Sequence, residues 1–459
     1  MMKRLIAACI ALLPVISHAQ RATLWLTKAN QSVLFQKQTE SLAFGPISGT
    51  ASSIYVDETK RFQSMDGFGY TLTGGSATLI NGLKPAEKAA LLRELFAIDA
   101  DNIGVSYLRI SVGASDLSDH VFTYNDLPAG QTDPTLNRFS LVEEQKDLIP
   151  VLKQVLAINP QLKILASPWT PPSWMKTNHD SKGGNLKPEF YDAYARYLVK
   201  YIQEMKKQGI RIEALTVQNE PLHPGNNPSL FMPQDEQANF IKKSLGPAFK
   251  AAKLNTKIII YDHNADRPDY PISILNDPEA RKYIDGSAFH LYGGGIDALR
   301  DVHEAHPDKN LYFTEQWIGA PANFGGDLLW HVKNLVIGAP RNWSKTVLEW
   351  NLAADPKQNP HTDGGCTACL GALTIGESII RNPAYYIIAH ASKFVRPGSV
   401  RIVSNVTLSL PNVAFKTPDG KTVLIVLNES DKPTTFNIRT KSKQLTPTLS
   451  GKTVATFVW

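Results

Sequence analysis

Apolar positions change their spacing twice along the chain, and the spacing predicts three regions. Short runs of alternating apolar residues near the N-terminus predict strands at 22–27 and 33–36. From about residue 66, strand-like runs alternate with segments whose apolar residues recur about every 3.6 positions, as in helices. Beyond Pro397 the helical spacing stops and short strands return, with Pro418-Asp-Gly420 as a hairpin turn.

The middle region predicts a parallel sheet with helical crossovers, because strands and helices alternate over roughly 330 residues. Its predicted strands are 105–110, 162–166, 212–217, 257–261, 286–291, 311–314 and 346–348, and its predicted helices are 85–96, 141–157, 188–208, 233–252 and 327–337. Polar and aromatic residues gather at the carboxyl ends of many of these strands, which favours a closed (β/α)8 TIM barrel over a doubly wound open sheet. No glycine-rich phosphate loop follows the first strand.

Both ends of the chain are expected to form one β-sandwich. Short strands are predicted at 400–403, 406–410, 413–415, 422–427, 434–438 and 454–459, whereas the early strands have no partner of their own before the barrel begins. The predicted organisation is therefore a signal peptide at 1–19, sandwich strands at 20–64, the barrel at 65–396 and the remaining sandwich strands at 397–459.

The first residues have the composition of a secretory signal. Lys3-Arg4 precedes an apolar stretch at 5–16, and Ser17-His-Ala19 places small residues at the cleavage positions. The alternative is a buried first helix. No cysteine follows the expected cleavage point near Ala19, and no later run approaches the roughly 18 apolar residues of a membrane span. We expect an exported protein, in the periplasm or the medium, with no membrane anchor.

Composition excludes several classes of function. The formal charge of +6 is dispersed over 459 residues without a run of five like charges, which argues against nucleic-acid binding. The chain has no GxSxG nucleophile motif, no HExxH zinc motif and no P-loop. We expect no metal and no cofactor.

Two cysteines remain after signal cleavage, Cys366 and Cys369. A CxxC pair can be a redox motif, half of a zinc site or a local disulfide. No second CxxC is present, and an oxidising compartment favours the disulfide over free thiols. Its expected role is to shape a loop.

Two glutamates carry the candidate chemistry. Glu220 closes the β-prone run of Leu215-Thr-Val-Gln-Asn-Glu-Pro221, and Glu315 closes that of Leu311-Tyr-Phe-Thr-Glu-Gln-Trp317. Paired carboxylates on separate strand ends suggest glycosidic bond cleavage, in which one protonates the departing oxygen while the other attacks the anomeric carbon. Asn219 can donate its amide to a sugar 2-hydroxyl. An ordinary loop at 218–221 is the alternative.

A buried arginine is expected to accompany Glu315. Arg109 lies in a β-prone run and needs a partner if it points into the barrel. Beside Glu315 it would keep that carboxylate ionised, as a nucleophile must be, although a purely structural ion pair is the alternative. His290 and Tyr292 can orient the same carboxylate by hydrogen bonding.

Aromatic rings follow several predicted strands. The proline-rich loop after residue 166 presents Trp169 and Trp174, and Trp350 follows a later strand. Flat indole faces suit the C–H faces of pyranose rings, although tryptophan is also a common core residue.

Eight motifs occur in a characteristic order: Asp66-Gly-Phe-Gly69, Leu108-Arg-Ile-Ser111, Ser115-Asp-Leu-Ser118, the proline-rich run 166–178, Val217-Gln-Asn-Glu-Pro221, His290-Leu-Tyr292, Phe313-Thr-Glu-Gln-Trp317 and Glu349-Trp-Asn-Leu352. In this order they resemble glycoside hydrolase family 30, the family that includes lysosomal glucosylceramidase. The resemblance runs from about residue 45 to the C-terminus.

The resemblance implies a (β/α)8 barrel with a β-sandwich built from both termini, and a retaining double displacement. By position, Glu220 matches the acid/base and Glu315 the nucleophile. Asn219 matches the residue that binds the sugar 2-hydroxyl. The residues that match the first glycone subsite are Asp116, Trp169 and Trp350. Those that match the surroundings of the nucleophile are Arg109, His290 and Tyr292.

Two segments depart from the lysosomal enzyme. Residues 355–369 look more like bacterial and fungal members that act on β-1,6-glucan, and residues 222–231 also differ. We therefore expect a retaining β-glucosidase or glucanase acting on β-1,6-linked glucan. The alternatives are a glucosylceramidase, a xylan-directed relative, or a carbohydrate-binding protein that uses the same groove without chemistry. The choice between endo and exo action and the oligomeric state stay open.

Overall fold

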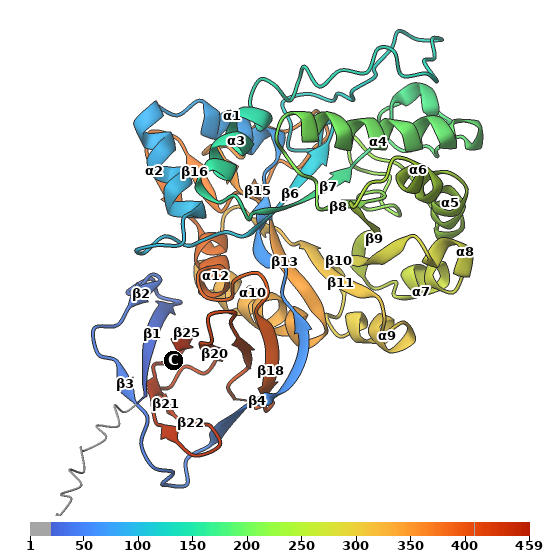
Figure 1. Ribbon diagram of the computed structural model, residues 1–459. Coiled ribbons are helices and arrows are strands. Elements are labelled where there is room, and N and C mark those ends of the chain that lie inside the picture. The colour runs from blue at the N-terminus through green and yellow to red at the C-terminus, as the bar shows by residue number, and fades with distance from the viewer. Residues whose placement is uncertain (1–19, 408) are drawn as a thin grey trace, which may run out of the picture.

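The protein folds into a closed barrel with an attached β-sandwich, as Figure 1 shows for the computed structural model. The structure describes residues 20–407 and 409–459, so the expected signal peptide lies outside the described residues. Eight parallel strands close the barrel: β5 (Gly67–Thr71), β6 (Tyr107–Val112), β7 (Lys163–Pro168), β8 (Ala214–Thr216), β9 (Lys257–Ala265), β10 (Ile284–Gly294), β11 (Asn310–Glu315) and β13 (Ser344–Asn351). The predicted TIM barrel is confirmed.

Helices surround the barrel and bury its outer surface. They are α1 (Gly74–Asn81), α2 (Pro85–Phe96), α3 (Leu148–Ile158), α4 (Tyr191–Lys207), α5 (Gln234–Phe240), α6 (Gly246–Ala251), α7 (Asp269–Leu275), α8 (Pro278–Arg281), α9 (Ala298–Ala305), α10 (Phe324–His331), α11 (Ala339–Arg341) and α12 (Pro383–Ser392). Residues 241–245 continue α5 into α6 as a π-helical turn, and residues 332–338 connect α10 to α11 in the same way.

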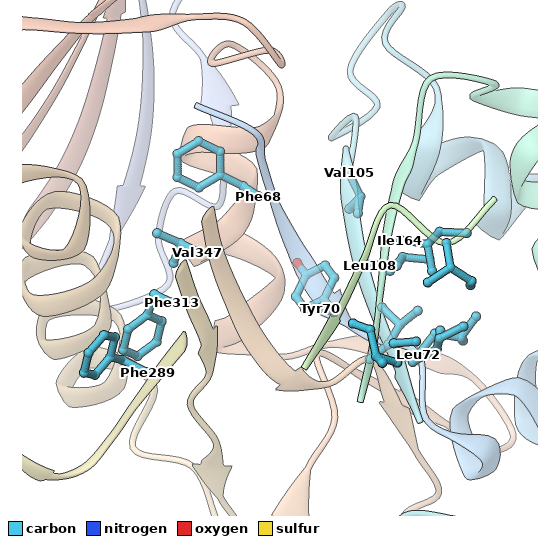
Figure 2. Close-up of a cluster of buried hydrophobic side chains, with 14 of the residues drawn as sticks. Phe68, Tyr70, Leu72, Val105, Leu108, Ile164, Phe289, Phe313 and Val347 are labelled. Atoms are coloured by element: carbon cyan, nitrogen blue, oxygen red, sulfur yellow. The ribbon is translucent and has the colours of Figure 1, made fainter. Parts of the chain in front are cut away.

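Apolar side chains on opposite faces of the strands build two cores. Phe68, Tyr70, Phe313 and others point outward toward the helices (Figure 2). Tyr107, Leu165, Ala214, Ile259, Ala288, Tyr312 and Leu348 point inward and fill the barrel. The filled interior makes the barrel a rigid support for residues at its strand ends.

The β-sandwich draws strands from both ends of the chain, as predicted. β1 (Arg21–Lys28) pairs antiparallel with β25 (Thr453–Val458), and β4 (Ser53–Ser64) pairs with β18 (Val400–Ser404). The other strands on this path are β2 (Gln36–Lys37), β19 (Asn412–Lys416), β20 (Thr422–Asn428), β22 (Asn437–Arg439) and β23 (Gln444–Leu445). The hairpin turn at 418–420 connects β19 to β20.

Local interactions overturn four expectations. The eighth barrel strand, β5, was missed because its sequence contains two glycines, and a Cβ at Gly69 would lie 1.9 Å from the Tyr107 carbonyl oxygen. The helix expected at 141–157 begins only at Leu148, since Glu144 turns inward to accept a hydrogen bond from Tyr124 (2.6 Å).

The two other differences are short strands. Residues 33–35 form a turn before β2, with the Phe35 N–H donating to the Thr27 hydroxyl (3.0 Å). The described residues of 406–410 lie outside strands, and the Thr407 hydroxyl donates to the Leu410 carbonyl (2.5 Å).

No helix in the described part of the chain combines the length and apolar character that a bilayer crossing requires.

Candidate active site

A cavity of about 660 Å³ opens at the carboxyl ends of the barrel strands. Its walls include Asp116, Trp169, Glu220, Tyr292, Glu315 and Trp350, which come from six different strands or the loops that follow them. The sequence analysis named all six as candidate site residues. This is the position at which TIM-barrel enzymes assemble their active sites.

The two glutamates face the same histidine. Nδ1 of His290 lies 3.3 Å from Oε1 of Glu220 and 3.7 Å from Oε1 of Glu315. The two carboxylate oxygens are therefore separated by at most about 7 Å, a bound that includes the roughly 5 Å spacing of retaining glycosidases. Both glutamates are buried, so little bulk water screens their interaction.

Arg109 organises the floor of the cavity. This fully buried guanidinium donates to Oε2 of Glu315 (2.5 Å), Oδ2 of Asp262 (2.8 Å), Oδ1 of Asn219 (2.6 Å) and Oγ of Ser167 (3.2 Å). The planar fork of an arginine can hold several acceptors in fixed positions at once. Because the Asn219 oxygen is used in this way, its amide N–H2 is the group left for a ligand.

The backbone around Glu220 is strained. Glu220 has a φ of 44°, and Tyr261 and Asp262, at the neighbouring strand end, have φ values of 73° and 63°. The Glu220 N–H donates to the Asp262 carbonyl (3.0 Å), which holds these two segments together. Such left-handed conformations are rare outside glycine and gather at functional sites.

Two histidines determine the protonation of Glu220. Nε2 of His290 contacts Oδ1 of Asp262 (3.1 Å), and Nδ1 of His263 lies 3.6 Å from Glu220. Burial would raise the pKa of Glu220, but the neighbouring imidazoles of His263 and His290 lower it. His290 has a pKa of about 9: burial lowers this pKa, but the charges of Glu315 and Asp262 and the bonds to Asp262 and Glu220 raise it. In the resting site the exchangeable proton therefore lies on His290, next to Glu220.

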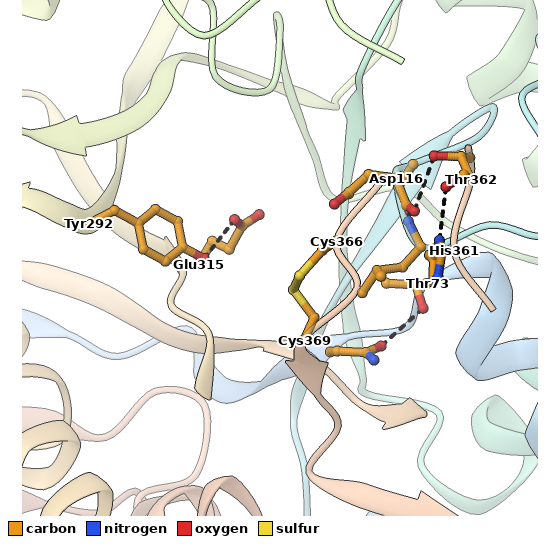
Figure 3. The surroundings of a disulfide bond; sticks show 11 residues. Thr73, Asp116, Tyr292, Glu315, His361, Thr362, Cys366 and Cys369 are labelled. Atoms are coloured by element: carbon orange, nitrogen blue, oxygen red, sulfur yellow. Dashed lines mark hydrogen bonds between the residues drawn. A yellow bond between two sulfur atoms is a disulfide. The ribbon is translucent and has the colours of Figure 1, made fainter. Parts of the chain in front are cut away.

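Glu315 receives two hydrogen bonds from opposite sides. The Tyr292 hydroxyl donates to its Oε1 (2.9 Å), as Figure 3 shows, and Arg109 binds its Oε2. Burial raises the pKa of Glu315, while the positive charges of His290 and Arg109 oppose the rise. Charge-assisted bonds of this kind favour the carboxylate form. His290, which the sequence assigned to Glu315 alone, lies closer to Glu220.

One end of the cavity is closed by aromatic rings and a disulfide. Trp169 and Trp350 stand 5.5 Å apart, and the Arg109 guanidinium lies 4.8 Å from the Trp169 ring centre. Cys366 and Cys369 are joined by a disulfide that packs against these rings. Burial and the charges of Glu315 and Glu220 raise the pKa of Asp116, at the same end, to about 7.

Three side chains of the cavity wall carry buried polar atoms without a hydrogen-bond partner among the described residues. They are Nε1 of Trp169, Oε1 of Gln316 and Nδ1 of His263. Buried polar atoms without partners are costly, so such a wall is complete only when a ligand supplies donors and acceptors. A ligand rich in hydroxyl groups meets this requirement.

Several residues behave differently from the sequence analysis or were absent from it. Trp174 lies outside the cavity lining, and its Nε1 donates to the Asn125 carbonyl (3.0 Å) as a core residue. Asp262 and His263 were missed, although they follow the apolar run of β9 at the same strand end as the other site residues. Trp330 was missed because it lies on α10 rather than at a strand end.

One group of cavity residues could hold a metal ion. Ligand atoms of Glu220, His263 and His290 lie within 4.8 Å of one another. Imidazole and carboxylate ligands of this kind suit Zn²⁺ or Cu²⁺. The same atoms hold the proton beside Glu220, so metal binding and protonation of Glu220 are mutually exclusive.

Comparison with known proteins gives a consistent family. Residues 65–395 match the glycosyl hydrolase family 30 TIM-barrel domain, and residues 398–457 match the beta sandwich domain of the same family. The endo-1,6-β-D-glucanase neg1 of Aspergillus fumigatus is 32% identical, with 88% of this chain and 86% of that protein covered. The lysosomal acid glucosylceramidase of Mus musculus is 30% identical, with coverage of 90% and 84%.

A solved structure agrees with these relatives. The endo-β-1,6-glucanase BT3312 superposes with a TM-score of 0.88 at 35% identity, covering 96% of this chain and 99% of that one. The fold, the position of the cavity and the matches over both modules lead to one assignment: this chain belongs to glycoside hydrolase family 30.

Proposed function

We propose that the protein is a retaining hydrolase of β-1,6-glucan, with Glu315 as nucleophile and Glu220 as acid/base. The observation that carries this proposal is a pair of buried glutamates that face one histidine. Of these two glutamates, Arg109 binds Glu315 but not Glu220. A carboxylate held by a guanidinium and a tyrosine hydroxyl stays ionised and fixed, as a nucleophile requires. A carboxylate next to a protonated imidazole has a proton within reach.

The first step breaks the glycosidic bond. Substrate fills the cavity and displaces water, which disfavours the charge on Glu220 and moves the proton from His290 to Glu220. Glu220 gives this proton to the departing oxygen while Glu315 attacks the anomeric carbon. The amide of Asn219 donates to the sugar 2-hydroxyl and holds it in place, and hydrogen bonds to this hydroxyl contribute to transition-state binding in glycosidases.

The second step reverses the roles of proton donor and acceptor. Glu220, now a carboxylate, takes a proton from water, and the resulting hydroxide attacks the anomeric carbon and releases Glu315. Two displacements at the same carbon return the original anomeric configuration. The product is a β-sugar hemiacetal.

Labelling and rescue test these roles separately. A 2-deoxy-2-fluoro-β-glucosyl fluoride should form a stable ester on Glu315 alone, which peptide mass spectrometry locates. Glu220→Ala should lose activity and recover it with azide, giving the β-glucosyl azide. Exposed Glu279→Ala is the matched control and should behave as wild type. An ester on another residue, or an α-azide, would overturn the assignment.

The open end of the cavity supports a polymeric substrate. Tyr292 and Trp330 are 37% and 41% exposed, unlike the buried Trp169 and Trp350 of the closed end. Exposed rings on a cavity rim are suited to stacking with further glucosyl units. Truncation by Trp330→Ala should reduce kcat/KM on β-1,6-glucan about fivefold and leave β-glucosyl fluoride turnover unchanged, since stacking contributes roughly 1 kcal/mol. Tyr55→Ala, on the sandwich, is the exposed aromatic control.

Relatives support the linkage, and a substrate panel tests it. Of the three similar proteins named above, two are endo-β-1,6-glucanases and one is a glucosylceramidase. Reducing-sugar release from pustulan, gentiobiose, xylan and glucosylceramide should be greatest on the β-1,6-linked substrates. Dominant glucosylceramide or xylan cleavage would replace the substrate assignment. Binding without product release from any of them would favour a carbohydrate-binding protein.

We further propose that the enzyme is exported. The signal-like composition of residues 1–19 and a disulfide at Cys366–Cys369 both suit an oxidising compartment. N-terminal sequencing of the mature protein should find a start near residue 20.

A further inference from the structure

The loop that ends in the disulfide lies between two parts of the site. Cys366 and Cys369 line the same cavity as Glu315 and Asp116. In Figure 3 the disulfide stands between the Tyr292–Glu315 pair on one side and Asp116 on the other. The loop that carries the disulfide is therefore placed to contact both Asp116 and the segment that carries Glu315.

One side of this loop is bound to the segment that follows Glu315. β15 (Cys369–Leu370) pairs antiparallel with β12 (Ile318–Gly319), with Cys369 opposite Gly319. The Ala320 N–H donates to the Ala368 carbonyl (2.9 Å) and extends this pairing. The position of Cys369 is thus fixed relative to the strand that carries Glu315.

The other side of the loop is bound to Asp116. The Thr362 N–H donates to the Asp116 carbonyl (2.9 Å), and the Thr362 hydroxyl donates to the Asn227 carbonyl (2.5 Å). A Cβ added at Gly365 would lie 2.3 Å from the Asp116 carbonyl oxygen, so the loop backbone presses directly on Asp116. The Cys366 backbone also lies close enough to the Asp116 carboxylate to oppose the rise in its pKa that burial causes. Asp116 itself follows β6 in a segment without regular secondary structure.

The disulfide connects these two anchors. Its sulfurs pack in an apolar cluster with Leu117, Trp169 and Trp350. A bridge across a sequence separation of three residues restricts the unfolded chain much less than a long loop would, so global stability is a poor explanation for it. Its effect is local: the residue bound to Asp116 cannot move independently of the residue bound to the nucleophile segment.

We propose that the Cys366–Cys369 disulfide positions Asp116 against the bound glucosyl unit and thereby determines glycone affinity. The inference rests on the proposed function, because it takes the closed end of the cavity as the glycone subsite. The bridge acts through Asp116 and does not touch the reacting atoms, so it is a positioning element.

Serine substitutions test the bridge itself. In Cys366→Ser, Cys369→Ser and the double variant, the KM for β-glucosyl fluoride and the Ki for a glucose-shaped iminosugar should rise about tenfold, as expected when one hydrogen bond to a charged group weakens. The kcat should change much less. All three variants should give the same rise, because either substitution removes the same bond. Gly365→Ala, which displaces Asp116 and leaves both cysteines in place, should raise KM similarly.

A double-mutant cycle separates positioning from general loosening. If the bridge acts through Asp116, then removing the disulfide from an Asp116→Asn enzyme should raise KM less than twofold. A change of that size is close to the error with which the free-energy effects of independent mutations add. Ile438→Val, a mild core truncation in the sandwich, controls for lost stability and should leave KM and Ki unchanged. The proposal would be overturned if bridge removal raised KM by the same factor with Asp116 and with Asn at position 116. It would also be overturned if the disulfide variants kept the wild-type KM.

Failure of the proposed function gives a different result. If the wild-type enzyme neither hydrolyses β-glucosyl fluoride nor binds the iminosugar, the glycone subsite is wrongly assigned. A wild-type enzyme that is active and unaffected by bridge removal contradicts only the role of the disulfide.

Discussion

Replacement of Arg109 tests the electrostatic basis of the site. Arg109→Met fills a similar volume but removes the guanidinium that Asp262 and Glu315 share, leaving these two buried carboxylates with His290 as their remaining positive neighbour. Removing one partner of a buried ion pair typically costs about 3–5 kcal/mol, a large part of the roughly 5–15 kcal/mol stability of a folded protein. The expected result is a clearly lower urea midpoint than in the wild type, with unfolding measured by tryptophan fluorescence. Midpoints are compared because a chain of two modules need not unfold in one step.

A second ion pair supplies the matched control. Arg381 binds Glu94 near the surface, where the side chains are 33% and 26% exposed. Such pairs contribute about 0–1 kcal/mol, so Arg381→Met should shift the midpoint little. Equal midpoints for Arg109→Met and wild type would refute the reasoning that an unpaired buried carboxylate is costly here.

Arg109→Lys separates charge from geometry. Lysine keeps the positive charge but cannot reproduce four hydrogen bonds made by a planar fork. The midpoint should recover in part, while kcat/KM falls roughly 10- to 150-fold, since a hydrogen bond to a charged group contributes about 1.5–3 kcal/mol. Wild-type kcat/KM in this variant would show that Glu315 needs charge alone.

Three further predictions follow from other contacts. Burial raises the pKa of Glu144 from 4.5 to about 7, so the contribution of this group to stability is fully present below pH 4.5 and decreases by about 3 kcal/mol as the pH rises to 7; Glu144→Gln should remove this part of the pH dependence of the urea midpoint. Micromolar Zn²⁺ should inhibit hydrolysis through Glu220, His263 and His290, and His263→Ala should weaken this inhibition at least tenfold, measured as the Ki for zinc. Tyr292→Phe removes a donor from the nucleophile and should reduce kcat/KM about tenfold with an unchanged melting temperature; an unchanged rate would contradict a role for this hydroxyl.

Periodicity was sufficient for a parallel sheet with helical crossovers, because each strand and each crossover helix must bury its own apolar face. The choice of a barrel over an open sheet needed the polar and aromatic residues at the strand ends as well. The same reasoning failed at β5, where Gly67 and Gly69 permit close strand contact instead of supplying apolar surface. It also failed at Glu144, because a single tertiary hydrogen bond to Tyr124 interrupts the predicted helix.

The candidate glutamates could be read from local context, since each closes a β-prone run next to a residue suited to sugar binding. Their protonation states could not be predicted from local context. His263 and His290 are 43 and 70 residues beyond Glu220 in the chain, yet their Nδ1 atoms lie 3.6 and 3.3 Å from its Oε1, and both lower its pKa. A pKa depends on distances between groups and on burial, and neither is a property of the linear sequence.

The sequence by itself determined the fold class, the two carboxylates and the pair of cysteines, because periodicity and short motifs are local properties. Only the tertiary structure decided that Arg109 also binds Asp262, that His290 lies nearer to Glu220, and that the disulfide loop holds Asp116. These contacts join residues far apart in the chain. They exist because closure of the barrel brings the ends of its eight strands together around one cavity.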